Sequence, residues 1–272
     1  MPLVMKWVVE DLTPFTAFYY RLVVAIVAVI VLRLIMRSPP LRFATNWRLY
    51  FWASIGIVPS GPLAYWSAQY LPSGVYAVVY GLMPFFVLPI ALLVGTNAVI
   101  NRVRWCSLVI AFLGLVGLSY SQLQGGFVQL PGLFICVVSA QIFALSIVMV
   151  GVTTDERVSV LNLINGSLIF ALVFLTPLLP VLDIKLHIQP ALSGVLGIIY
   201  LGAIGSVFSY IAYYYLLAHI SPVSVSILFL ISPLLAVLIG AGLNAEHYGV
   251  IDVMSIGVMT LSLAAYSLVT RE

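Results

Sequence analysis

The sequence predicts an all-α polytopic membrane protein with ten transmembrane helices, the first of them incomplete, arranged as two inverted repeats of five helices. Three observations lead to this fold class. The composition is 63% hydrophobic and only 7% charged, with a mean hydropathy of +1.20. The apolar runs are much longer than the strands of about ten residues that build a membrane β-barrel. The second half of the chain also repeats a pattern found in the first half.

The apolar runs give the elements in order. A chain of 272 residues with so few polar groups cannot cover a water-soluble globule, and helices satisfy their own backbone hydrogen bonds in lipid. At about 20 residues a span, we expect helices at residues 14–36, 47–70, 72–95, 103–121, 128–151, 158–181, 190–218, 220–242 and 249–269. The stretch 1–11 is about half a span, so we expect that the beginning of a first helix is missing. No signal peptide is expected, because a basic n-region and a small-residue cleavage site are absent.

The internal repeat becomes visible when the chain is laid against itself with an offset of 149 residues. Six identities then fall in equivalent helix pairs, and they join Ile55, Gly56, Val58, Ser60, Tyr65 and Pro84 to Ile204, Gly205, Val207, Ser209, Tyr214 and Pro233. Duplication of a membrane unit is typical of transporters. We therefore divide the chain into repeats at 1–122 and 123–272, with the polar stretch Ser121–Gln129 as the junction.

The basic residues predict the orientation in the membrane. Eight of them would lie on one side of a ten-helix protein, at Arg33, Arg37, Arg42, Arg48, Arg102, Arg104, Arg157 and Arg271. The loops of the other side carry only Lys185. The arginine-rich side is therefore expected to be cytoplasmic, together with both termini. Five helices per half make the repeats inverted, an arrangement that permits alternating access to a substrate site near the midplane.

The net charge of +3 implies neither nucleic acid nor an acidic partner, because most of the charges lie at or near helix ends. Cys106 and Cys136 lie in apolar runs without the spacing of a disulfide framework or a metal site, so we expect packing or lipid-facing roles. No cofactor is predicted, and the expected partners are a small-molecule substrate and the bilayer. The oligomeric state stays open.

Three segments resemble the EamA branch of the drug/metabolite transporter superfamily: KWVVEDLTPFTAFYYRLVVA (6–25), LPSGVYAVVYGLMPFFVLPIALLVG (71–95) and ISPVSVSILFLISPLLAVLIGAGLNAEHYGV (220–250). The resemblance implies a ten-helix inner-membrane carrier of small metabolites, often amino acids or related compounds and often outward. The family usually has a Glu after the fourth helix, where this chain has Gly95, Thr96 and Asn97. Glu246 stands at the expected place in the second half.

Arg21 lies several residues inside an apolar helix, where an arginine costs roughly 2.5 kcal/mol or more unless it is paired or reaches water. One interpretation is a cation that faces the central cavity and holds a carboxylate or phosphate of the substrate. The other is a structural arginine that binds helix-end carbonyls or extends past Tyr19 and Tyr20 to the surface. The resemblance places an Arg here in members with different cargo, which favours the structural interpretation.

Aromatic and polar residues gather on the third and eighth helices, at Tyr65, Trp66 and Gln69 and at Ser209, Tyr210, Tyr213 and Tyr214. They could line a cavity with apolar walls and hydroxyl groups. The alternative is an aromatic belt at the membrane interface. Pro84 and Pro233 are matched and would kink the fourth and ninth helices, as suits a gate, although kinks needed only for packing are the alternative. Near them are the candidate cavity residues Tyr76, Tyr80 and Ser232, with Asn165 on the seventh helix.

The acidic residues lie in or near loops or, like Asp252, a few residues into the last helix, so no proton or sodium site is evident. The three histidines also lie in loops, and neither HExxH nor GxSxG occurs, which argues against an intramembrane enzyme. A non-transporting scaffold or sensor remains a competing interpretation. The sequence favours a carrier with a cavity lined by the second, third, fourth, eighth and ninth helices.

Overall fold

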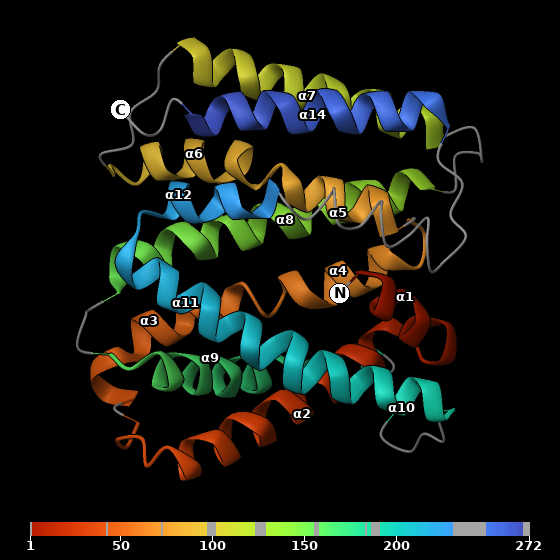
Figure 1. The fold of residues 1–272 in the computed structure, drawn as a ribbon. Helices are drawn as coiled ribbons and strands as arrows, with labels where there is room; N and C mark the ends of the chain where they lie inside the picture. Colours follow the sequence, from red (N-terminus) through yellow and green to blue (C-terminus); the bar gives the residue numbers. More distant parts are fainter. Residues whose placement is uncertain are drawn as a thin grey trace.

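The regular elements in the described part of the chain are all helices (Figure 1). The structure is a computed structural model that describes residues 2–41, 43–71, 73–96, 102–122, 129–154, 158–182, 184–185, 191–230 and 249–268. The first half contains α1 (Pro2–Asp11), α2 (Pro14–Ile35), α3 (Phe43–Ile55), α4 (Ser60–Ala68), α5 (Ser73–Gly81), α6 (Met83–Leu93) and α7 (Arg102–Gln122). The second half contains α8 (Gln129–Thr153), α9 (Val160–Leu175), η2 (Thr176–Leu178), α10 (Leu192–Ile199), η3 (Tyr200–Phe208), α11 (Ser209–His219), α12 (Pro222–Ile227), η4 (Leu228–Leu230) and α14 (Val250–Leu268).

Helices from the two halves are interleaved. The α7 and α14 helices pack against each other as an outer pair, drawn at the top of Figure 1. Below them α6 packs against α8 and α12, and α4 packs against α8. Further down, α3 packs against α9, and α2 packs against both α9 and η3. The first half of the chain thus packs against the second half through several helix pairs.

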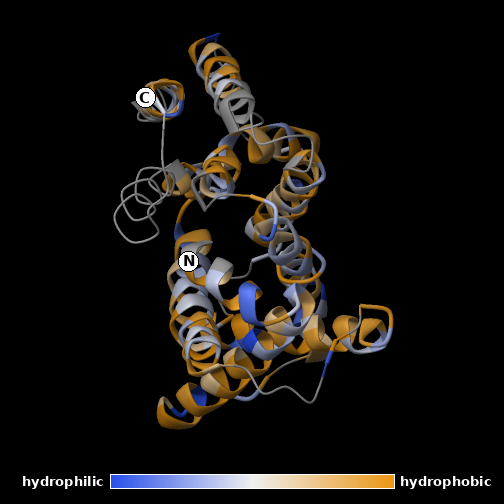
Figure 2. Ribbon diagram, turned by 90° about the vertical axis from the view of Figure 1, so that its right-hand side faces the viewer, coloured by the Kyte–Doolittle hydropathy of each residue, from blue (hydrophilic) through white to orange (hydrophobic). Residues whose placement is uncertain are grey.

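Five described segments are long and apolar enough to cross a membrane: Pro14–Ile35, Val75–Leu93, Leu130–Thr153, Val160–Leu178 and Leu192–His219. Apolar residues run along most of the helices (Figure 2). The segments Trp105–Gly114 and Val250–Tyr266 are shorter apolar helices. These features fit a multi-pass membrane protein, as the composition predicts.

Two of the expected spans are divided by prolines or glycines. The apolar run predicts one helix at 47–70, but a turn at residues 56–59 separates α3 from α4. Pro59 ends this turn and has no N–H to donate. The span expected at 72–95 is divided at Leu82, between α5 and α6, and Pro84 occupies the first turn of α6. Pro84 cannot donate to the carbonyl four residues earlier, so the α-helical ladder stops beside Tyr80.

The span expected at 190–218 contains a segment of different helical form. Residues of η3 make a π-helix between the α-helices α10 and α11, so one continuous span has three parts. At Gly202 this span approaches α2 closely, because a Cβ there would lie 2.6 Å from the Cβ of Val24 and 3.0 Å from the carbonyl oxygen of Arg21. A glycine therefore sets the spacing between η3 and α2.

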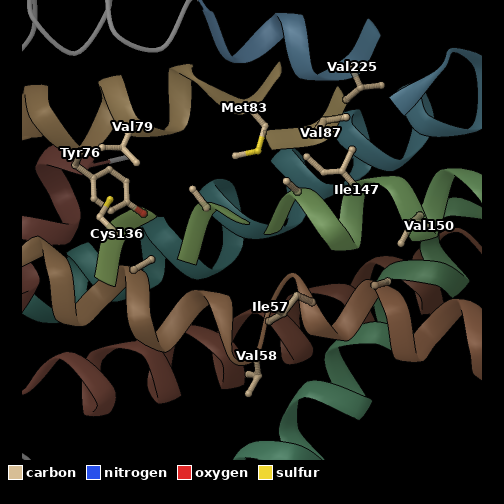
Figure 3. Close-up of a cluster of buried hydrophobic side chains, with 14 of the residues drawn as sticks. Ile57, Val58, Tyr76, Val79, Met83, Val87, Cys136, Ile147, Val150 and Val225 are labelled. Carbon is tan, nitrogen blue, oxygen red and sulfur yellow. The ribbon is translucent and has the colours of Figure 1, made fainter. Parts of the chain in front are cut away.

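A cluster of buried hydrophobic side chains joins the α3–α4 turn, α5, α6, α8 and α12 (Figure 3). Tyr76 of α5 lies beside Cys136 of α8, and Val87 of α6 lies near Ile147 of α8 (Figure 3). Cys136 is fully buried, whereas Cys106 is exposed on α7, which agrees with a packing role for the first and a lipid-facing position for the second.

Candidate functional site

A cavity of about 270 Å³ lies among helices of both halves. This volume is close to the lower end of the range of small-molecule pockets, about 300–1,000 Å³. Its described lining comes from α1, α2, the α3–α4 turn, α4, α5, α8, η3, α11 and η4. The lining residues are Met5, Phe18, Arg21, Gly56, Ser60, Gly61, Ala64, Tyr76, Ala77, Tyr80, Phe143, Gly205, Ser209, Tyr210, Tyr213 and Phe229.

Arg21 lines this cavity and contacts the opposite half of the chain. Its Nε donates to Ser206 Oγ at 2.9 Å, and its Nη1 donates to Tyr65 Oη at 3.4 Å. The guanidinium carbon also lies 5.6 Å from the centre of the Tyr65 ring, within cation–π distance. The side chain is therefore directed toward the cavity and the second half of the chain.

The π-helical segment holds the partner of Arg21 in place. Ser206 Oγ donates to the carbonyl of Leu201 at 2.9 Å, five residues earlier in η3. Since a hydroxyl has one proton to donate, this bond leaves Ser206 as an acceptor for Arg21 Nε. The close approach at Gly202 brings α2 near enough for that contact. Residues of the π-helix thus fix the arginine from two directions.

A second polar group on the wall joins α4, α5 and α8. Ser139 Oγ donates to the carbonyl of Ser60 at 2.7 Å, and Ser60 Oγ donates to the carbonyl of Ser139 at 3.0 Å. The hydroxyl of Tyr80 lies 2.9 Å from Ser139 Oγ. Tyr76 and Tyr80 stack with ring centres 4.9 Å apart. These contacts make a rigid wall that carries hydroxyl groups and two parallel rings.

A second group of lining residues, adjoining Tyr80, is aromatic. Phe143 of α8 stacks on Tyr213 of α11 with ring centres 5.8 Å apart, and Phe229 of η4 lies edge-on to Phe143 at 5.9 Å. The hydroxyl of Tyr213 is buried and has no hydrogen-bond partner among the described residues. A buried hydroxyl without a partner is costly.

The candidate residues from the sequence divide between the cavity and its surroundings. Arg21, Tyr76, Tyr80 and Tyr210 are among the lining residues. Tyr65 and Tyr214 are buried in the core beside it, with 0% and 2% of their surface exposed. Tyr65 still reaches the cavity through its contact with Arg21.

Other candidates lie away from the described lining. Trp66 packs on Tyr70 with ring centres 4.7 Å apart, and exposed Gln69 donates to the carbonyl of Trp66. Asn165 is buried within α9. Pro84 is buried at the start of α6. Ser232 and Pro233 lie outside the described residues, and so does Glu246.

The lining has an internal correspondence. Five pairs of lining residues are separated by 149 positions, the offset of the sequence repeat: Gly56 and Gly205, Ser60 and Ser209, Gly61 and Tyr210, Ala64 and Tyr213, Tyr80 and Phe229. The turn at 56–59 corresponds in the same way to residues 205–208 of the π-helix. Equivalent interruptions of two spans therefore lie at one cavity.

Sequence reasoning missed several of these groups. The turn with Gly56 and the start of α4 with Ser60 and Gly61 have a clear signal in GIVPSGP, where glycines and prolines interrupt an apolar run. Phe143 and Ser139 on α8 had no such signal, because their role depends on which helices meet in space. Within the described residues no group of three or more His, Cys, Asp or Glu side chains is placed to hold a metal ion.

The sequence model of the EamA-like transporter family matches residues 1–120 and 130–268, nearly the whole chain. Among the similar proteins is the uncharacterized inner membrane transporter YedA of Escherichia coli K12, which is 28% identical over 241 residues, 85% of this chain and 74% of YedA. YedA of E. coli O157:H7 gives the same figures. A solved structure described as "Crystal structure of protein" matches with a TM-score of 0.73 at 15% identity, over 98% of each chain, which shows likeness of fold.

Proposed function

Because this chain belongs to the EamA-like transporter family, we propose that it is a secondary transporter that carries a small metabolite across the inner membrane by alternating access. The two halves, 1–122 and 123–272, act as inverted repeats. Both termini are cytoplasmic in this proposal, as the arginine distribution predicts. The observation that carries it is the cavity between the halves, lined by five residue pairs that are 149 positions apart.

The helix contacts support the two-repeat part of the proposal. Exchanging the halves turns the contact of α3 with α9 into that of η3 with α2, and turns the contact of α4 with α2 into that of α11 with α9. The pairs α2–α9 and α7–α14 are converted into themselves. Such reciprocal contacts allow two equivalent conformations in which the halves exchange roles, which is the basis of alternating access.

The interrupted helices are the proposed moving parts. The α3–α4 turn, the break at Leu82 and the π-helix η3 each lie next to lining residues. A broken ladder bends more easily than a continuous helix, and π-helical segments often mark functional sites. We assign the gate to these segments, with Pro84 and Pro233 at matched places in the two halves.

The proposed cargo is an amino acid or a related compound, and the proposed direction is outward. The cavity volume suits a molecule of that size. A polar group is expected to contact Arg21 and the wall hydroxyls, while the apolar part lies against the rings.

Transport by the purified full-length chain in proteoliposomes tests the proposal. Stabilising ligands are first selected from a library of amino acids, nucleotides and metabolites by thermal shift, and their radiolabelled forms are then followed into the vesicles. We expect saturable uptake of one chemical class and accelerated exchange when unlabelled substrate is present inside. No stabilisation and no uptake across the library would favour a scaffold or sensor.

Cysteine labelling tests the orientation. A single cysteine in place of Arg42 is expected to react with an impermeant thiol reagent only after the cytoplasmic side is opened. Labelling in intact cells would overturn the proposed topology and, with it, the inverted repeat as drawn here.

A further inference from the structure

The guanidinium of Arg21 has no carboxylate partner among the described residues that line the cavity. Its described contacts, Ser206 Oγ and Tyr65 Oη, are both uncharged hydroxyl groups. A cation without a counter-ion is costly in the low-dielectric interior of a membrane protein. An anion that enters the cavity would therefore supply the partner that the surrounding side chains do not.

The position of the guanidinium suits a carboxylate. The group carries five N–H donors in a planar fork, and the described contacts use Nε and Nη1. Ser206 holds one edge of the fork, and the Tyr65 ring lies 5.6 Å from its carbon. Because Arg21 lines the cavity, N–H groups remain for a ligand there, and an arginine fork matches the two oxygens of a carboxylate.

The rest of the cavity suits a flat apolar body and has no carboxylate among its described lining residues with which an ammonium group could pair. Tyr76 and Tyr80 stack on one wall, and Phe143 stacks on Tyr213 on another. The described lining residues include neither Asp nor Glu. The ammonium group of an amino acid would therefore leave water without gaining a carboxylate, near a fixed positive charge.

We propose that the cavity recognises an organic monoanion, a carboxylate on a flat apolar body, with Arg21 as its anchor. This inference rests on the proposed transport function and replaces amino acids as its preferred cargo by related compounds without the ammonium group: the anion is preferred to a zwitterionic amino acid of the same shape. Aryl and branched oxo or hydroxy acids belong to this class.

Binding by the full-length chain in nanodiscs tests the preference with probes of matched shape. The probes are 3-phenylpropanoate, phenylalanine and 3-phenylpropan-1-ol, together with inorganic phosphate. We expect 3-phenylpropanoate to bind at least about tenfold more tightly than the zwitterion and the alcohol, since charge-assisted hydrogen bonds to arginine are the stronger ones. Equal or tighter binding of phenylalanine, of the alcohol or of phosphate would overturn the inference.

Variants connect the preference to one side chain. Arg21→Gln is expected to abolish the advantage of the anion over the alcohol, and Arg21→Lys to keep part of it. Arg48→Gln, on the exposed face of α3, is the control and should leave the advantage unchanged. If Arg21→Gln does not fold, the wild-type probe series and Arg21→Lys still decide.

Failure of this inference is distinguishable from failure of the transport proposal. A transported amino acid that binds more tightly than its deaminated analogue would refute the anion preference and leave the transporter in place. Absence of binding by all four probes would also overturn the anion preference, whereas the metabolite library tests transport itself.

Discussion

The packing of α2 against η3 and the packing of α9 against α3 involve equivalent stretches of the two halves, yet they use different chemistry. Arg21 and Phe170 are separated by 149 positions, the offset of the repeat. Arg21 donates to Ser206 across the first interface. Phe170 lies at the second interface, with its ring centre 6.5 Å from that of Tyr50 and 6.4 Å from that of Phe43.

Both interfaces rely on a glycine for close approach. A Cβ at Gly202 would lie 2.6 Å from Val24, and a Cβ at Gly166 would lie 2.5 Å from the ring of Tyr50. In both interfaces a glycine therefore allows the helices to approach closely, while the other side chains at the contact differ. In the proposed repeat, the helix packing is thus similar in both halves, while a charge lies at the cavity in one half only.

The largest expected effect comes from removing the charge of Arg21, compared with changing the matched ring of Phe170. Arg21→Ala should lower the transport rate at least about 100-fold, because it removes the only described cation of the lining. Phe170→Leu should leave transport within about threefold and cost about 1 kcal/mol of stability. Initial rates in proteoliposomes and thermal unfolding measure the two quantities. Equal loss of transport in both variants would remove the distinction between the interfaces.

The second largest effect is expected from a bulkier residue at Gly202, where η3 contacts α2. Gly202→Val should cost about 1–3 kcal/mol of stability by overpacking against Val24 and lower transport at least about tenfold. Gly257→Val on α14 is the matched control, because a Cβ there would meet no atom within 4 Å. Normal transport by Gly202→Val would show that the close approach does not position Arg21.

Removing the acceptor of Arg21 has a smaller effect. Ser206→Ala should reduce substrate affinity or rate about fivefold to thirtyfold, since a hydrogen bond to a charged group contributes about 1–2 kcal/mol. Ser167→Ala, a buried α9 serine that donates to the carbonyl of Ile164, should stay close to wild type. Similar losses in the two variants would assign both serines to packing.

The smallest effect compares two matched tyrosines. Tyr65→Phe removes a long hydrogen bond of 3.4 Å to Arg21 but keeps the ring below the cation, so we expect a change of about twofold to threefold. Tyr214→Phe, 149 positions later, has no described contact with the arginine and should leave substrate affinity unchanged. Titration of each variant with the transported substrate measures the difference. A larger loss of substrate affinity in Tyr214→Phe than in Tyr65→Phe would contradict the role given to the Arg21 side of the cavity.

The sequence predicted the helical membrane fold because composition and apolar run length are local properties, and the family match confirmed the resemblance. Proline also predicted where the helix of α5 and α6 would be disturbed. The stripe of Tyr65, Trp66 and Gln69 was harder, because the turn at 56–59 resets the helix face. Ser60, Gly61 and Ala64 line the cavity instead of Trp66 and Gln69.

The environment of Arg21 depended on information that no local pattern contains. Its partner Ser206 is 185 residues away in the chain. Ser206 lies in a π-helix, in which backbone hydrogen bonds join residues five apart instead of four. Its sequence, YLGAIGSVF, looks like that of an ordinary apolar α-helical span. That this arginine lies at the cavity is visible only once the two halves are packed together.

The claim that both halves line one substrate cavity is tested most directly by a matched pair of cysteines. Ser60→Cys and Ser209→Cys, in a background with Cys106→Ser and Cys136→Ala, place nearly isosteric thiols at lining positions 149 residues apart. Buried Ser167→Cys in the same background is the control. The account predicts that a small thiol reagent modifies both lining cysteines and that the transported substrate protects both. Protection of neither cysteine, or of only one, would contradict a shared site.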